Sequence, residues 1–90
     1  MESLFQLNVP LAQQAYVLAS VRQLTDESQV VDVYFTNQRG ISVLLGRKQY
    51  ETNMCTEEQT ARAILDICYD VDAQIAALAI LQQKVLYGKT

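Results

Sequence analysis

Three aspartates in the last third of the chain form its densest acidic group and are the first candidates for chemistry. Asp66 and Asp70 are four positions apart, so on a helix they share one face, with Asp72 close by. Paired carboxylates act as general acid and base, or bind a hard cation, when a pocket or further oxygen ligands support them. The sequence shows neither support. We therefore expect a solvated acidic face whose main role is solubility. Docking of a basic partner is its functional interpretation, and a small acidic metal-binding protein is the less favoured alternative.

Nucleophilic catalysis has no support in the residue types. The chain contains no histidine, which serine and cysteine nucleophiles normally use as their base. Cys55 and Cys68 lack the C-x-x-C spacing of a zinc or redox site, so we expect two reduced thiols. There is no glycine-rich phosphate loop or nucleotide fingerprint. The sequence predicts a protein that is not an enzyme and holds no metal or cofactor.

The basic residues offer a second function. Arg39, Arg47 and Lys48 gather on one short segment, as in β-ribbons that read nucleic acid. The chain as a whole is acidic, with seven basic and ten acidic residues and a net charge of −3. Nucleic-acid binders normally carry a basic stripe instead. A dimeric nucleic-acid-binding regulator is therefore an alternative and not the leading hypothesis.

Length and composition limit the structure that holds any such site. Ninety residues suffice for one hydrophobic core, and half of them are apolar, which is typical of a globular domain. We expect residues 1–90 to form a single small domain. The start of the chain lacks the cationic and apolar runs of a secretion signal, and no window reaches the ~20 apolar residues of a membrane span. These features predict a cytoplasmic protein without a membrane partner.

The first quarter of the chain predicts a short extended segment followed by a helix. Residues 4–9 are apolar at every second position over most of their length, which is the period of a strand. Pro10 suits the first turn of a helix, where its missing N–H is no loss. Apolar residues then recur at steps of three and four, which predicts a helix running to about Leu24.

The middle of the chain predicts a β-hairpin. Residues 30–35 and 41–45 are rich in β-branched, aromatic and other apolar side chains. Between them, Asn37 tolerates turn geometry and Gly40 can adopt a positive φ. A helix over residues 38–50 is the competing interpretation.

The last third predicts one long helix. Thr56 is followed three residues later by Gln59, the pattern of a capping box, and two glutamates in between favour the positive end of the helix dipole. Gly88 is a natural stop. A continuous helix from Glu57 to Tyr87 would be roughly 46 Å long.

Apolar residues along this helix recur at alternating steps of three and four, a heptad seam suited to packing against another helix. A straight helix would extend beyond a domain about 30 Å across, and residues 75–81 are apolar all round, so a partner chain is expected to cover them. A bend near residues 69–72 would remove the overhang, but no glycine or proline is there to cause it. The seam comprises Ala61, Ile64, Cys68, Val71, Ile75, Leu78 and Val85, interrupted by Gln82.

These features together predict an α+β fold with an N-terminal helix, a β-hairpin and a long C-terminal helix packed on a small antiparallel sheet. So small a sheet favours a homodimer, by helix pairing or sheet extension, and another protein is the other expected partner. The predicted function is a protein-binding module, such as a regulator, adaptor, inhibitor or chaperone-like protein. The predicted partner-binding residues are Ile64, Cys68, Val71, Ile75, Leu78 and Val85, with Asp66 and Asp70 on the acidic flank.

Overall fold

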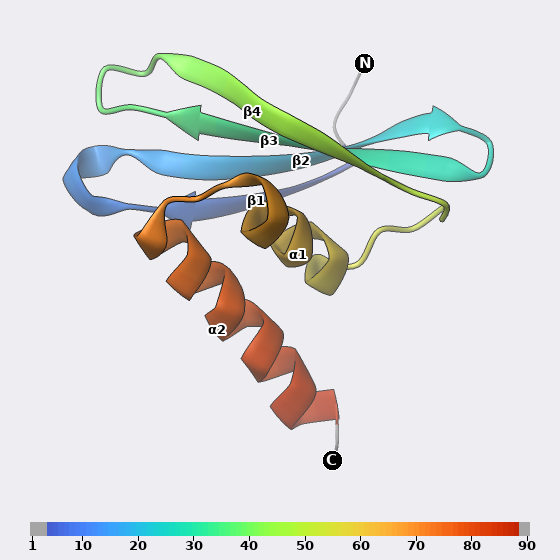
Figure 1. The fold of residues 1–90 in the computed structure, drawn as a ribbon. Helices are drawn as coiled ribbons and strands as arrows, with labels where there is room; N and C mark the ends of the chain where they lie inside the picture. Colours follow the sequence, from blue (N-terminus) through green and yellow to red (C-terminus); the bar gives the residue numbers. More distant parts are fainter. Residues whose placement is uncertain (1–3, 89–90) are drawn as a thin grey trace.

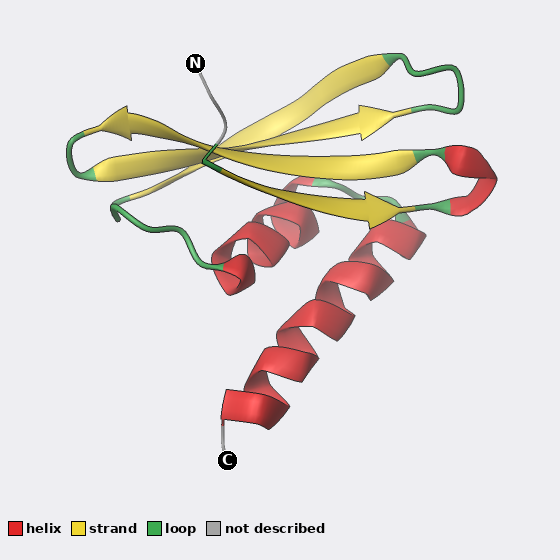
Figure 2. Ribbon diagram, turned by 180° about the vertical axis from the view of Figure 1, so that it is seen from behind, coloured by secondary structure: helices red, strands yellow, loops and turns green. Residues whose placement is uncertain are grey.

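The chain forms a two-layer α+β fold (Figure 1). The computed structural model describes residues 4–88, except for the side chains of residues 84–88. Four strands form one antiparallel sheet in the order β1-β2-β3-β4, and both helices cover the same face of it (Figure 2). This confirms the α+β class, and β1 is the predicted early extended segment. The elements are β1 (Phe5–Pro10), the 3₁₀ turn η1 (Ala12–Gln14), β2 (Tyr16–Thr25), β3 (Ser28–Thr36), β4 (Ser42–Tyr50), α1 (Glu57–Ile67) and α2 (Val71–Gly88).

The N-terminal helix predicted for residues 10–24 is wrong, because the segment forms η1 and β2. Val17, Ala19 and Val21 are buried while the residues between them are less so, which is the two-residue period of a strand. Apolar residues are so dense here that the helical and strand periods are both present in the sequence. Pro10 instead ends the edge strand β1, a position that tolerates its missing N–H.

The predicted β-hairpin is confirmed as β3 and β4, so the competing helix over residues 38–50 does not form. The side chain of Asn37 accepts hydrogen bonds from the backbone N–H groups of Arg39 and Ile41. Gly40 has a φ of 83°, in the left-handed region that favours glycine. The turn is therefore closed by the two residue types that the sequence indicated.

The single long helix predicted over Glu57–Tyr87 is also wrong, since the segment forms two shorter helices, α1 and α2. The predicted capping box at its start is confirmed. The side chain of Thr56 accepts a hydrogen bond from the Gln59 N–H, and the Gln59 side chain accepts one from the Thr56 N–H. α1 therefore begins where the sequence predicts.

The break between the helices comes from an aspartate cap. α1 ends at Ile67, and Cys68 already has an extended backbone. Asp70 then begins α2, because its carboxylate accepts a hydrogen bond of 3.1 Å from the N–H of Ala73. A side chain that satisfies a free N–H can start a new helix without help from glycine or proline.

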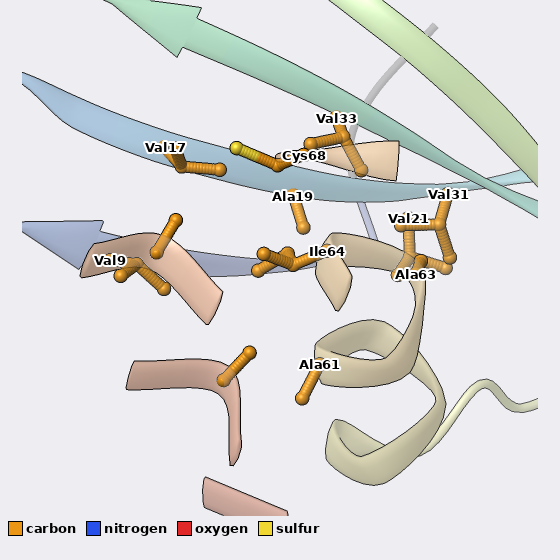
Figure 3. Packing of buried hydrophobic residues seen from close by; sticks show 12 residues of the cluster. Val9, Val17, Ala19, Val21, Val31, Val33, Ala61, Ala63, Ile64 and Cys68 are labelled. Carbon is orange, nitrogen blue, oxygen red and sulfur yellow. The ribbon is translucent and has the colours of Figure 1, made fainter. Parts of the chain in front are cut away.

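The core lies between the sheet and the two helices (Figure 3). Ile64 of α1 is the largest fully buried side chain among the described residues, and the alanines around it allow the layers to approach closely. Gly46 does the same in β4, since a Cβ there would lie 3.0 Å from Cγ2 of Ile67. The buried cluster comprises Val9, Val17, Ala19, Val21, Val31, Val33, Ala61, Ala63, Ile64, Cys68, Ala73 and Ala77.

A buried glutamine ties the loop before α1 to the sheet. Nε2 of Gln29 donates hydrogen bonds of 2.8 Å to Oε1 of Gln23 and to the carbonyl of Asn53. Oε1 of Gln29 accepts a third bond, also 2.8 Å, from the Cys55 N–H. The loop that leads from β4 to α1 is thus fixed to the start of β3 by one amide group.

Candidate functional site

The outer side of α2 carries large apolar side chains exposed to water. Val71, Ile75 and Leu78 follow one another at steps of four and three, so they share one stripe of the helix. The stripe lies opposite Ala73 and Ala77, which are buried in the core. The exposed fractions of the three residues are 68%, 61% and 46%. A contiguous set of exposed apolar residues is typical of an interaction site.

Tyr69 adds an aromatic residue at the start of this stripe. It lies in the break between the two helices and is 82% exposed. Tyrosine is enriched in protein interfaces because it combines apolar area with a polar tip. Tyr69, Val71, Ile75 and Leu78 are referred to below as the α2 row.

The structure divides the predicted partner-binding residues. Ile64 and Cys68 are buried inside the chain, because the inner face of α1 packs on the sheet, so neither presents a surface to a partner. The structure places both of them in the chain's own core. Val71, Ile75 and Leu78 are exposed, whereas the side chain of Val85 lies outside the described part of the chain.

The predicted acidic flank serves the fold. Asp66 forms an ion pair with Lys48 of β4, and this hydrogen bond raises the pKa of Lys48. Asp70 caps α2, as described above. Among the described residues, no three acidic or cysteine side chains gather as a metal site would require. The geometry thus gives no support to a metal centre on these aspartates.

The three predicted cations do not share a surface. Arg47 and Lys48 are neighbours on β4, so their side chains point to opposite faces of the sheet. Lys48 faces the helices and Asp66, whereas Arg47 lies on the open face, the side of the sheet without helices. Arg39 is exposed in the hairpin turn. The basic cluster in the sequence is therefore not a basic patch in space.

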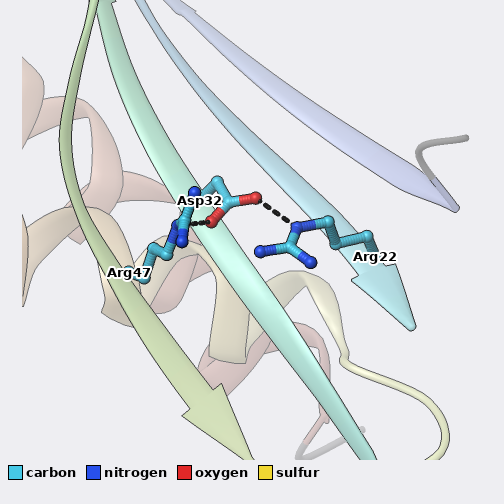
Figure 4. Close-up of polar contacts among 3 residues, drawn as sticks. All are labelled: Arg22, Asp32 and Arg47. Atoms are coloured by element: carbon cyan, nitrogen blue, oxygen red, sulfur yellow. Dashed lines mark hydrogen bonds and ion pairs between the residues drawn. The ribbon is translucent and has the colours of Figure 1, made fainter. Parts of the chain in front are cut away.

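A buried carboxylate that the sequence analysis did not single out lies on the open face (Figure 4). Asp32 of β3 is only 4% exposed. Nε of Arg22 donates a 2.7 Å hydrogen bond to its Oδ2, and Nε of Arg47 lies 2.9 Å from its Oδ1 as an ion pair. The hydrogen bond raises the pKa of Arg22. One carboxylate thus joins side chains from β2, β3 and β4.

The sequence did contain a signal for this network. Asp32 is the only charged residue among the β-branched and aromatic residues 30–35. A charge in a buried strand needs a partner, because burying it alone is very costly. The identity of the two arginines, by contrast, depends on strand register, which pairs Asp32 directly with Arg47 and places Arg22 diagonally across from it.

A groove of about 410 Å³ lies between η1 and the turn of the hairpin. Among the described residues that line it, Arg39 is the only charged one, beside Phe35, Ile41 and several small or amide side chains. These residues do not include the pair of titratable groups that acid and base catalysis would use.

No protein-family model, curated protein or solved structure matches this chain. Within the part of the chain that the structure describes, no helix combines the length and apolar character needed to cross a membrane. The chain's own surfaces are therefore the basis for assigning a function.

Proposed function

We propose that this chain is a small non-enzymatic protein-binding module, acting as a regulator, adaptor, inhibitor or chaperone-like protein through its α2 row. The observation that carries the proposal is the exposure of three side chains aligned on α2 and of Tyr69 just before the helix, from 46% at Leu78 to 82% at Tyr69. An apolar stripe on a helix fits an apolar groove on a partner protein, where its members act as anchors at steps of three and four.

The α2 row is held in a fixed orientation, which favours binding. Ala73 and Ala77 anchor the opposite side of α2 in the core. The start of the helix is fixed by the Asp70 cap and by Gln74, whose Nε2 donates a 3.1 Å hydrogen bond to the Cys68 carbonyl. A preorganised surface loses little conformational entropy on association. Each aliphatic residue of the row contributes on the order of 1–2 kcal/mol when a partner covers its exposed part.

We also propose that the protein binds its partner in the cytoplasm. Cys55 and Cys68 are both free thiols, as is usual in a reducing compartment. Burial raises the pKa of the Cys55 thiol, so its reactive thiolate form is disfavoured at neutral pH. The separation of Arg39, Arg47 and Lys48 gives no reason to prefer the nucleic-acid alternative.

The test first identifies the partner and then breaks the contact. A photo-crosslinking residue at Gln82, next on the stripe after Leu78, captures the chain that covers the row, and the same residue at Gln83 is the control. The affinity of the captured protein is then measured. We expect Ile75→Asp and Leu78→Asp each to weaken binding at least about tenfold, because a charge would be buried in an apolar contact. Gln83→Asp introduces the same charge elsewhere on α2 and should change affinity less than about twofold.

Circular dichroism checks that these variants remain folded, which we expect because all three positions are exposed. Binding that survives both Ile75→Asp and Leu78→Asp in folded protein contradicts the proposal.

A further inference from the structure

We propose that two copies of this chain pair antiparallel along β4 and join their sheets into one. This contact involves the opposite layer of the molecule from the α2 row and does not depend on it. Its basis is the edge of the sheet, the exposed apolar residues along that edge and the charges at its two ends.

β4 is a long strand with one free side. It has nine residues and pairs only with β3 in the described chain. In an antiparallel pair, every second residue of an edge strand directs its N–H and C=O away from its neighbour. These groups form a template for a further strand, which natural proteins usually block.

The other edge of the sheet is blocked in the usual ways. β1 has only six residues, ends in Pro10, and α2 packs against it (Figure 1). β4 has one irregularity, a register shift opposite Val33 and Tyr34. Arg47 and Lys48 do not block strand pairing at the edge. Ion pairs with Asp32 and Asp66 hold their side chains over the two faces of the sheet. The first half of β4 has no charged residue at all.

Exposed apolar side chains lie along and just before the first half of β4. Ile41, Val43, Leu44 and Leu45 are between 41% and 58% exposed. Val43 is paired with Phe35 and Leu44 with Tyr34, so the two leave opposite faces of the sheet uncovered. The exposed fractions of these four residues add up to about two complete aliphatic side chains per copy. A second strand alongside would cover both faces at once and bury a matching set of its own.

The charges at the two ends of β4 favour a second copy of this chain as the added strand, in the antiparallel direction. Arg39 lies just before the strand and Glu51 just after it, and neither forms an ion pair with a described residue. β4 alone spans about 26 Å at about 3.3 Å per residue, so the two charges cannot meet within one chain. An antiparallel copy centred near Leu45 brings the turn that carries each Arg39 to the end of the other copy's strand that is followed by Glu51. A parallel copy would place like charges together.

The first test disrupts the apolar contact. We expect the purified protein to be a dimer in sedimentation equilibrium, and Leu44→Lys to raise its dissociation constant at least about tenfold. Leu24→Lys is a matched control, because Leu24 is exposed to a similar degree, 45% against 41%, but lies at the far end of the β2–β3 hairpin. It should leave the dissociation constant within about twofold of the unchanged protein.

The second test reverses charges at two exposed positions, where we expect little effect on folding. Arg39→Glu or Glu51→Arg alone should weaken dimerisation by about three- to tenfold, since two exposed ion pairs become repulsive. The double variant should return to within about twofold of the original value, and the effects should shrink at high salt. Rescue of this kind requires contact between copies.

The outcomes separate this contact from the α2 row. Ile75→Asp should leave the dimer intact if β4 forms it. A monomer at all concentrations, a dimer equally sensitive to Leu24→Lys and Leu44→Lys, or a charge reversal without rescue each overturns the proposal.

Discussion

The two sides of strand β3 are buried by opposite kinds of chemistry. On the helix side, Val31 and Val33 lie in the apolar core beneath α1 (Figure 3). On the open face, Asp32 is covered by the side chains of Arg22 and Arg47 from the flanking strands (Figure 4). The apolar side needs a second layer to exclude water, whereas the charged side is closed by its own neighbours. A sheet can thus leave one face without helices and still bury its central strand on both sides.

The apolar side should show the largest energetic effect. Ile64→Ala removes the largest fully buried side chain and leaves a cavity between the layers, so we expect a loss of about 3 kcal/mol in the free energy of unfolding. Ile75→Ala removes the same atoms from the exposed α2 row and should cost less than about 0.5 kcal/mol. Urea denaturation of both variants measures the difference. Equal losses would contradict the burial of Ile64 and the exposure of Ile75.

The charged side should show the next largest effect. Asp32→Asn preserves shape but leaves two guanidinium groups without their shared carboxylate, so we expect a loss of about 2–3 kcal/mol. Asp66→Asn is the matched control, because it also removes one negative charge from an ion pair. The Asp66 side chain is 43% exposed, and its loss should cost less than about 1 kcal/mol.

The same urea measurements decide this case. If Asp32→Asn and Asp66→Asn cost the same, the carboxylate of Asp32 stabilises the open face no more than an ordinary surface pair. If Asp32→Asn is more stable than the unchanged protein, the free-energy cost of burying the Asp32 carboxylate exceeds the stabilisation from its two arginine partners.

The smallest expected effect is a difference in the pH dependence of stability between Lys48, on the helix side of the sheet, and Arg47, on the open face. The folded-state pKa of Lys48 is raised by Asp66, so its stabilising contribution is present at neutral pH and is lost as pH rises through that raised value. Burial raises the pKa of Tyr50, which also makes unfolding easier at alkaline pH because the unfolded chain releases the proton first. A guanidinium group, unlike an ammonium group, is not deprotonated in proteins.

We therefore expect the stability difference between the unchanged protein and Lys48→Met, under about 1 kcal/mol near neutral pH, to disappear at strongly alkaline pH. The difference for Arg47→Met should persist there, provided that both variants remain folded. Parallel pH curves for the two variants would contradict this distinction.

Local rules in the sequence predicted the elements whose signals are carried by a few neighbouring residues. The hairpin followed from β-branched runs around Asn37 and Gly40, and the start of α1 followed from Thr56 and Gln59. β2 was mistaken for a helix because its apolar residues fit both periods, and only pairing with two neighbouring strands decides between them.

The predicted binding surface stays a prediction. The heptad seam included Val71, Ile75 and Leu78, which the structure leaves exposed, but periodicity does not show where a seam enters the core. That depends on the helix break at Asp70, whose hydrogen bond from the Ala73 N–H is a local cap that the continuous apolar periodicity on both sides of it concealed. The Arg22 and Arg47 partners of Asp32 depend on register and were likewise beyond local rules.

The amide of Gln29 has a consequence for how the molecule comes apart. It binds the β4–α1 loop at two points, and its partners at Asn53 and Cys55 lie just before the helical layer. The helices cannot swing away from the sheet without opening this side chain and exposing valines of β2 and β3. We therefore expect the two layers to unfold as one cooperative unit, and the Cys55 amide, although in a loop, to exchange its hydrogen with solvent as slowly as the central strands do.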